Sequence, residues 1–226
     1  MRDLSPPTVM FIDTETSGLY RKDLSIDDPG QPWAMSIAAA LCNDAEELIN
    51  FFSFVIKADG RTAKENAVNV HGISARATSQ IGIPEPRALG ALTDMLKTAP
   101  MDVALKVVTF GDFDGKILSS LFARFAISQN KPSNTYDRLW LRRPLTEFVN
   151  LQVPVCQMAC KLPSEFEGGG DYKWPSLDEA CEIMLGMAPR PGRHDAWEDL
   201  CRLKALYFEC VKRGYIETES ANTGHN

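Results

Sequence analysis

The sequence lacks the patterns that mark membrane, fibrous and zinc-ribbon proteins. No apolar run approaches the roughly 18 residues that a membrane-spanning helix needs. With 15 glycines and 14 prolines in 226 residues, the chain is not collagen-like or of low complexity. Its six cysteines include no C-x-x-C pair, which excludes a zinc ribbon and a thioredoxin-type redox motif. We therefore expect one globular domain with reduced thiols.

Basic residues are also in short supply. The chain has 24 Lys and Arg against 30 Asp and Glu, a formal net charge of -6 at pH 7. This balance argues against sequence-independent wrapping of duplex DNA, which needs a basic surface. It leaves room for a single-stranded end as substrate, because acidic clusters that hold divalent cations add to the negative total. Prolines stand near the N-terminus where a secretory leader would have its apolar stretch, so the sequence predicts a cytoplasmic protein with no membrane partner.

Hydrophobic periodicity predicts an α/β domain. The predicted strands are 8–13, 33–41, 48–56, 102–110 and 151–155, the second and third forming a hairpin. The predicted helices are 63–70, 85–97, 114–125, 177–185 with a capping box at Ser176 and Glu179, and 196 to near 214. We expect a single domain over 1–216, an insertion at about 129–150 and a disordered tail at 217–226.

Asp13 and Glu15 close the first predicted strand at a spacing that turns both side chains to one face. Like charges side by side raise one pKa and destabilise the fold, unless a divalent cation uses both carboxylates as oxygen ligands. The alternative is a pair of exposed acids at a strand end, and an isolated D-x-E pattern favours that alternative.

A second acidic segment lies at the start of the last predicted helix. In R-H-D-A-W-E-D, Asp199 lies four residues after Asp195 on the first turns, and His194 precedes the helix on a loop. A fixed metal ligand beside a mobile base suits the activation of water. The alternative is an exposed loop histidine, with acids that only stabilise a helix N-terminus.

Asp114 supplies a carboxylate at the end of the fourth predicted strand, where sites in α/β sheets lie. Asp112 lies two residues earlier and competes for the role, because side chains two residues apart on a strand point to the same face. Asp114 opens the predicted helix and precedes Gly115, which permits close approach of backbone or substrate, so we prefer Asp114.

Together these segments resemble a known nuclease family. FIDTETSGL at 11–19, FDGKIL at 113–118 and HDAWED at 194–199 resemble the three motifs of the DEDDh 3'-5' exonucleases, the class of the DNA polymerase III proofreading subunit, ribonuclease T and oligoribonuclease. HGIS at 71–74 resembles the H-G-[IL]-[ST] segment of that family, and KWPSLDEAC at 173–181 resembles the segment before the third motif. The likeness covers most of the chain.

The resemblance implies a ribonuclease H-like α/β fold, with a five-stranded mixed sheet flanked by helices. It implies the ligands of two Mg²⁺ or Mn²⁺ ions and a general base, which are Asp13, Glu15, Asp114 and Asp199 for the metals and His194 for the base. The residues that it places beside the terminal nucleotide are Thr14, Thr16, Gly18, Leu19 and His71. The implied reaction hydrolyses terminal phosphodiester bonds of single-stranded DNA or RNA and releases nucleoside 5'-monophosphates.

Other functions stay open at this stage. A catalytically idle module of the same fold would bind nucleic acid or a polymerase without turnover, and a metal-dependent phosphatase would act on small esters. The candidate partners are single-stranded 3' ends, a polymerase and a second copy of the chain. The family commonly has His-Asn shortly before its second aspartate, where this chain reads Thr109, Phe110, Gly111 and Asp112, so substrate contacts there stay undefined.

Three further features have two interpretations. The segment 131–143 carries a net charge of 4 - 1 = +3 with Tyr136 and Trp140, which suits a single strand but also a solvated loop whose aromatic rings pack on the core. His71 either contacts the terminal nucleotide or caps the turn at Gly72. We expect Trp174 and Trp197 to lie in the core.

Overall fold

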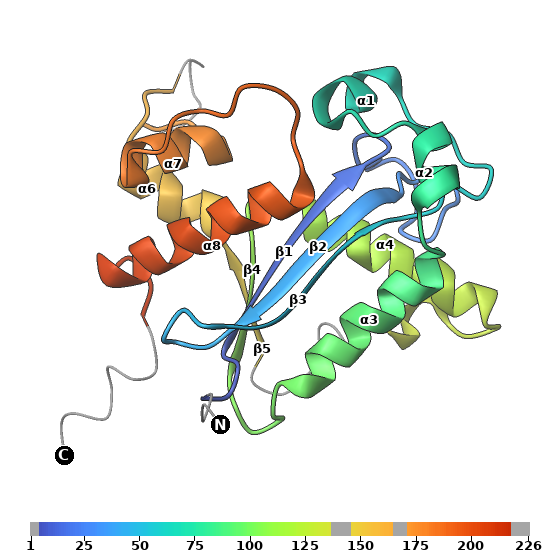
Figure 1. Cartoon of the computed structure of the whole chain (residues 1–226), viewed down its shortest axis with the longest axis horizontal. Coiled ribbons are helices and arrows are strands. Elements are labelled where there is room, and N and C mark those ends of the chain that lie inside the picture. Colours follow the sequence, from blue (N-terminus) through green and yellow to red (C-terminus); the bar gives the residue numbers. More distant parts are fainter. Residues whose placement is uncertain (1–4, 137–145, 165–170, 218–226) are drawn as a thin grey trace.

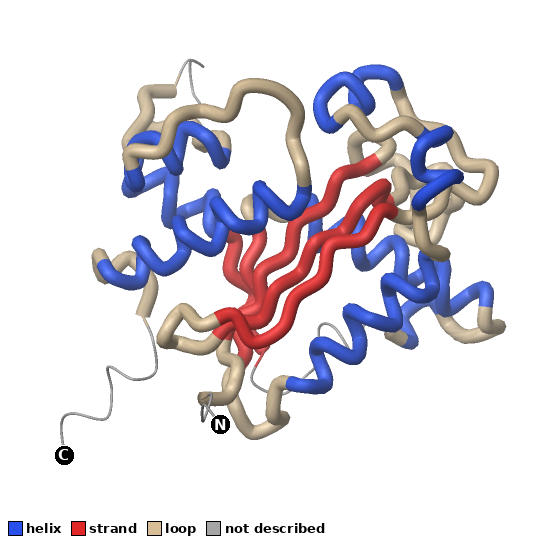
Figure 2. Tube along the Cα trace, viewed as in Figure 1, coloured by secondary structure: helices blue, strands red, loops and turns tan. Residues whose placement is uncertain are grey.

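The computed structural model describes residues 5–136, 146–164 and 171–217. Its strands are β1 (Val9–Thr16), β2 (Ala34–Cys42), β3 (Leu48–Val55), β4 (Leu105–Thr109) and β5 (Thr146–Asn150). They form one sheet in the order β3-β2-β1-β4-β5 (Figure 2). The first three strands are antiparallel neighbours, whereas β4 runs parallel to β1 and β5 parallel to β4. The expected five-stranded mixed sheet and its hairpin are confirmed.

Helices cover both faces of this sheet. They are α1 (Glu65–His71), α2 (Ala75–Ile81), α3 (Glu85–Thr98), α4 (Phe113–Ser128), α6 (Gln157–Cys160), α7 (Leu177–Leu185) and α8 (Ala196–Lys212). The predicted helices at 85–97, 177–185 and 196 onward are confirmed, and so is the capping box at Ser176. No helix in the described ranges is long and apolar enough to cross a membrane.

Side-chain alternation along β1 divides the core into two parts. Met10 and Ile12 pack with α3 and α4 on one face of the sheet. Val9 and Phe11 pack with α7 and α8 on the other, where the Phe11 ring lies 5.4 Å from that of Tyr207. Figure 1 shows α8 lying across one face and α3 across the opposite one. Because β1 is covered on both sides, its carboxyl end is held firmly between the two helical layers.

The prediction of a strand at 151–155 was wrong. The fifth strand is β5, and residues Leu151–Cys156 form a kinked helical segment instead. The Asn150 side chain accepts hydrogen bonds from the N–H groups of Gln152 and Val153 at 3.0 and 3.4 Å, which ends the strand. Leu151 is buried in this turn, while Val153 and Val155 are half-buried, so the apolar pattern reflected partial burial and not an extended strand. The last part of the expected insertion at 129–150 therefore belongs to the sheet.

The basic and aromatic segment at 131–143 is described only in part. Tyr136 packs on Phe122 and Phe125 of α4, with ring centroids 6.1 and 5.3 Å away, and Lys131 lies over its ring. This residue follows the interpretation in which aromatic rings pack on the core. Arg138, Trp140, Arg142 and Arg143 lie outside the described residues, as does 218–226 of the expected tail.

Candidate active site

Asp13 and Glu15 lie near the carboxyl end of β1. Burial raises the pKa of Glu15 to about 8, and the carboxylates of Asp199 and Asp114 raise it too. Burial also raises the pKa of Asp13 well above its ordinary value, with further contributions from Asp114, Asp199 and Glu15. Crowded carboxylates of this kind are stable in their ionised form only when positive charge is close.

Asp114 joins this pair from the first turn of α4. Its side chain is buried, and its Oδ1 accepts hydrogen bonds from the Thr14 hydroxyl at 2.6 Å and the Thr14 N–H at 3.0 Å. Burial raises the pKa of Asp114 to about 6, although the bonds from Thr14 lower it. Asp112 instead points to solvent, 71% exposed, and forms an ion pair with Lys116. The structure thus brings Asp114 into the acidic cluster and leaves Asp112 outside it.

Asp199 and His194 enter from the start of α8. The Asp195 carboxylate caps this helix by accepting hydrogen bonds from the N–H groups of Trp197 and Glu198. This cap places Asp199 on the first turn of α8, where its side chain is buried. Nδ1 of His194 lies 3.2 Å from Oδ2 of Asp199. Glu15, His194 and Asp199 each offer one ligand atom, and these three atoms lie within 4.8 Å of one another.

Arg190 is a charged neighbour of the cluster that sequence reasoning missed. Its guanidinium forms an ion pair with Asp199, and its Nε lies 3.3 Å from Oδ1 of Asp178. The Arg190 side chain is only 11% exposed, and its charge lowers the pKa values of Asp13 and Glu15. A single arginine in a Pro- and Gly-rich loop gives no periodic signal, so the sequence could not connect it with the carboxylates.

The residues expected beside the terminal nucleotide lie at the end of β1 and after it. The Thr16 hydroxyl donates to the Gly18 carbonyl at 2.8 Å, and Leu19 is 72% exposed. Nδ1 of His71 accepts the Ile73 N–H at 3.0 Å, so Nε2 carries the ring hydrogen and donates to the Thr16 carbonyl at 3.1 Å. Both ring nitrogens of His71 are therefore engaged, and Nε2 links the ring to the Thr16 backbone.

The HGIS segment also supports the loop that carries His194. The His194 N–H donates to the Val70 carbonyl at 3.0 Å, which ties this loop to the last turn of α1. Gly72 ends α1 with φ of +75°, and the Arg193 side chain lies so close that a Cβ at Gly72 would come within 2.3 Å of its Cδ. A side chain at Gly72 would therefore displace Arg193.

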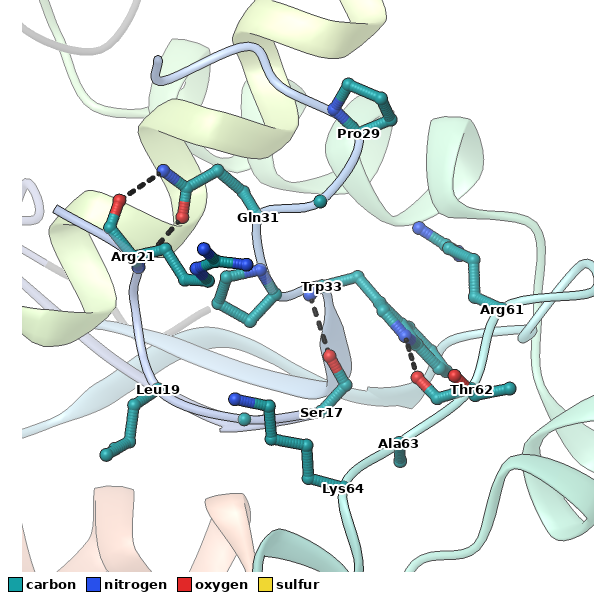
Figure 3. Close-up of a pocket in the computed structure, with 13 residues that line it drawn as sticks. Ser17, Leu19, Arg21, Pro29, Gln31, Trp33, Arg61, Thr62, Ala63 and Lys64 are labelled. Atoms are coloured by element: carbon teal, nitrogen blue, oxygen red, sulfur yellow. Dashed lines mark hydrogen bonds between the residues drawn. The ribbon is translucent and has the colours of Figure 1, made fainter. Parts of the chain in front are cut away.

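A cavity of about 310 Å³ lies behind Gly18 (Figure 3). It is lined by residues 17–19, 29–33 and 61–64 together with Arg21. The Trp33 indole N–H donates to the Thr62 carbonyl at 3.0 Å, which fixes one wall. Figure 3 shows the side chains of Arg21 and Lys64 on the Leu19 side of the cavity.

The donor set of the acidic cluster fits divalent cations. Four carboxylates from β1, α4 and α8 are hard oxygen ligands. Burial and then the neighbouring carboxylates raise the pKa values of Asp13, Glu15 and Asp114, and a cation would offset both effects. Two ions of this type need shared carboxylates on rigid elements, which a strand end and two helix starts provide. The structure therefore presents a candidate metal centre, and the residues that would form it are Asp13, Glu15, Asp114 and Asp199.

Comparison with solved structures identifies exonucleases as similar folds. A structure of Escherichia coli exonuclease I with a dT13 oligonucleotide matches with a TM-score of 0.65 and 16% identity, over 92% of this chain and 41% of that one. The zinc-bound form of the E. coli ExoI–ssDNA complex matches with a TM-score of 0.64 and 17% identity, over 92% of this chain and 41% of that one. Exonuclease I from Methylocaldum szegediense matches with a TM-score of 0.64 and 16% identity, over 91% of this chain and 40% of that one.

These similarities establish the fold. The five-stranded mixed sheet with its helices is the ribonuclease H-like α/β fold that the sequence led us to expect. This chain spans about two fifths of the length of the exonuclease I structures that it matches. No protein-family model matches the sequence, and no curated protein sequence matches it either.

Proposed function

We propose that this chain is a metal-dependent 3'-5' exonuclease of the DEDDh type. It would hydrolyse terminal phosphodiester bonds of single-stranded DNA or RNA and release nucleoside 5'-monophosphates. The observation that supports this most strongly is the convergence of Asp13, Glu15, Asp114 and Asp199 from three distant segments, with His194 beside Asp199. The likeness in fold to exonuclease I, which has been solved with bound oligonucleotides, supports it further.

Asp13, Glu15, Asp114 and Asp199 would hold two Mg²⁺ or Mn²⁺ ions. When bound, such ions lower the pKa of a water molecule and stabilise the charge that develops on the leaving oxygen. Thr14 holds Asp114 through two hydrogen bonds and is in this proposal a positioning residue.

His194 would act as the general base. Because its Nδ1 faces the Asp199 carboxylate, its Nε2 is the atom left to take the proton from the attacking water. The half-exposed ring stands at the edge of the acidic cluster, where solvent and a substrate end can reach it. The loop that carries it is held to α1 through the Val70 carbonyl.

The end of β1 would receive the terminal nucleotide. Leu19 offers an exposed apolar side chain on which the last base can pack, and the Thr16 hydroxyl lies close to where the 3'-hydroxyl would enter. A Cβ at Gly18 would come within 3.1 Å of Lys64 Cδ, so the glycine lets the Lys64 side chain lie against this turn. His71 would contribute by keeping the Thr16 backbone in place.

The test uses 5'-labelled single-stranded DNA, duplex DNA and RNA with Mg²⁺ or Mn²⁺. The proposal expects a ladder that shortens from the 3' end, with nucleoside 5'-monophosphates as the released product. Asp114→Asn should abolish the ladder, whereas the matched variant Asp112→Asn should keep most of the activity, because Asp112 lies outside the cluster. Binding of the strand without any turnover would indicate the idle module, and release of inorganic phosphate from small esters would indicate a phosphatase.

A further inference from the structure

A second hollow, of about 400 Å³, lies between Leu19 and the start of α4. We propose that it binds one unpaired nucleobase of the strand by its Watson–Crick edge and so selects single-stranded ends. This inference rests on the proposed function. The residues that carry it are Asn150, Gln152 and Trp174, with Lys22 and Lys116 at the same hollow. We call it the Trp174 hollow.

Trp174 provides a stacking face. It was expected in the core, but the structure shows it 66% exposed, so that expectation was wrong. The neighbouring backbone is fixed, because the Lys173 N–H donates to the Leu162 carbonyl and the Pro175 carbonyl accepts from Gln152 Nε2 at 3.0 Å. An exposed indole on a fixed backbone is a favourable platform for a base, since every base has a π-face.

Asn150 provides a fixed hydrogen-bond donor. Its Oδ1 accepts from the N–H groups of Gly111, Gln152 and Val153 at 3.0, 3.0 and 3.4 Å. Three donors on one oxygen determine which end of the amide is oxygen and which is nitrogen. The Asn150 amide NH₂ then has no hydrogen-bond partner within the described part of the chain, although Asn150 lines the hollow.

Gln152 provides the matching acceptor. Its Nε2 is occupied by the Pro175 carbonyl, so its Oε1 is the free end of the amide among the described residues. Oε1 lies 3.2 Å from the position that a Cβ on Gly111 would take, which places it against the backbone of the turn before α4. The glycine at this turn thus makes room for the carboxamide that the hollow presents.

Asn150 and Gln152 both line the hollow, and in this proposal their donor and acceptor together meet the Watson–Crick edge of a base. Adenine and cytosine offer an amino donor next to a ring nitrogen acceptor, and guanine and thymine offer a ring N–H next to a carbonyl. A base that uses this edge in the hollow cannot be paired in a duplex at the same time. The amide pair therefore accepts any base but rejects a paired one.

The charges at the hollow fit the backbone that carries such a base. Lys22 is exposed and has no ion pair within the described ranges, while Lys116 pairs with Asp112. In a chain with a net charge of -6, lysines at this position attract phosphates locally without a basic surface overall.

The experiment measures binding of fluorescent single-stranded 12-mers by anisotropy, with Ca²⁺ as the only metal and strand integrity checked on a gel. One abasic nucleotide is moved stepwise inward from the 3' end. Wild-type protein should lose affinity when the abasic site reaches one position. Trp174→Ala should weaken binding by about 5- to 150-fold, the range for one lost base stack, and should abolish that dependence on position. Tyr215→Ala, an exposed aromatic residue elsewhere at 49%, is the matched control.

Asn150→Asp tests the donor separately. The aspartate keeps the oxygen that accepts the three backbone N–H groups but replaces the NH₂ donor with an acceptor. It should weaken single-strand binding and reduce the preference for a single strand over a blunt duplex, while thermal unfolding stays close to that of wild type. If Trp174→Ala binds intact and abasic strands as wild type does, or if wild type binds blunt duplex as tightly as single strand or binds no strand, the inference is overturned.

The test separates this inference from the proposed activity. A protein that shows the abasic pattern but releases no nucleotide with Mg²⁺ or Mn²⁺ supports the hollow and overturns the exonuclease. A protein that degrades the strand without any abasic pattern supports the exonuclease and overturns the hollow.

Discussion

Arg190 is the one cation that the structure shows in an ion pair with a residue of the acidic cluster, within the described ranges. Its charge opposes the repulsion between the carboxylates and lowers the pKa values of Asp13 and Glu15. It also holds Asp199 at one oxygen, opposite to the oxygen that faces His194. Arg190 therefore supplies positive charge that helps to hold these carboxylates together.

Replacing Arg190 with Gln should move metal binding to higher pH, because Asp13 and Glu15 would then ionise less readily. The expected shift is on the order of one pH unit. The measurement is the affinity for Mn²⁺ as a function of pH by titration calorimetry. Arg202→Gln is the control, since Arg202 pairs with Asp178 and not with Asp199. An unchanged pH dependence in Arg190→Gln would contradict this role.

The raised pKa of Glu15 also predicts how stability depends on pH in chelator. The ordinary pKa of Glu15 is 4.5, and in the folded chain it is about 8. Between these two pH values, Glu15 holds a proton in the folded chain that it has released in the unfolded chain. The free energy of unfolding of the metal-free protein should therefore fall as pH rises through this window, and Asp114 adds to the fall between 3.8 and about 6. Saturating Mg²⁺ should remove the decline. Thermal unfolding from pH 5 to 9, with and without Mg²⁺, measures this.

Removal of the proposed base gives the second catalytic prediction. His194→Ala should lower kcat by about a hundred- to ten-thousand-fold, the usual contribution of a positioned general base. Affinity for Mn²⁺ should change little, because the four carboxylates remain. Single-turnover assays with a labelled strand measure the loss, and a variant with the turnover of wild type would show that another group takes the proton.

The carboxylates and His194 were recoverable from the sequence because each lies at a strand end or a helix start that local patterns mark. Asp114 could be preferred over Asp112 because it stands at the start of a run of apolar residues with helical spacing. The structure places Asp114 in the acidic cluster. Arg190 and Trp174 could not be found in this way. Their roles depend on which elements pack around them, and neither has a periodic neighbour.

At the scale of elements, the turn after α1 decides where the His194 loop lies. Gly72→Ala should displace Arg193 and strain a residue at φ of +75°, so kcat should fall on the order of a hundredfold through misplacement of His194. Gly60→Ala is the matched control, because Gly60 has φ of +83° but nothing within 4 Å of an added Cβ. Comparison of kcat and Tm for both variants checks this, and equal loss of kcat in both would rule out a specific effect of the turn.

Among the elements, long periodic segments were predicted well and short ones poorly. The helices α3, α7 and α8 and the hairpin of β2 and β3 have strong patterns with caps or turns that local physics determines. β5 has only five residues at the sheet edge, where Glu147 and Phe148 are exposed, so its pattern was weaker than that of the apolar run after it. The short α2, capped by Ser74, was not predicted for a similar reason.

At the scale of the whole molecule, charge is distributed unevenly. The chain is acidic overall, yet Arg21, Lys22 and Lys64 gather beside Leu19 (Figure 3 shows the first and the last). Binding of a single strand should therefore involve few phosphates and depend only modestly on salt, with each contact adding about 0.7 to the logarithmic slope.

Lys64→Ala should reduce that slope by about 0.7 if Lys64 contacts a phosphate, while Lys212→Ala at the far end of α8 should leave it unchanged. Anisotropy titrations of a labelled strand at several salt concentrations give both slopes. Equal slopes for the wild type and Lys64→Ala would place the strand away from the cavity behind Gly18.

The hydrogen bonds from Thr14 to Asp114 join residues that are 100 positions apart, and Asp199 comes from later still. During synthesis on the ribosome, β1 emerges with two of its acids long before α8 exists. A growing or partly folded chain would thus carry no complete acidic cluster. If the chain has the activity proposed above, the order in which its parts are made would keep it inert toward the messenger and other nucleic acids until α8 has docked against the sheet.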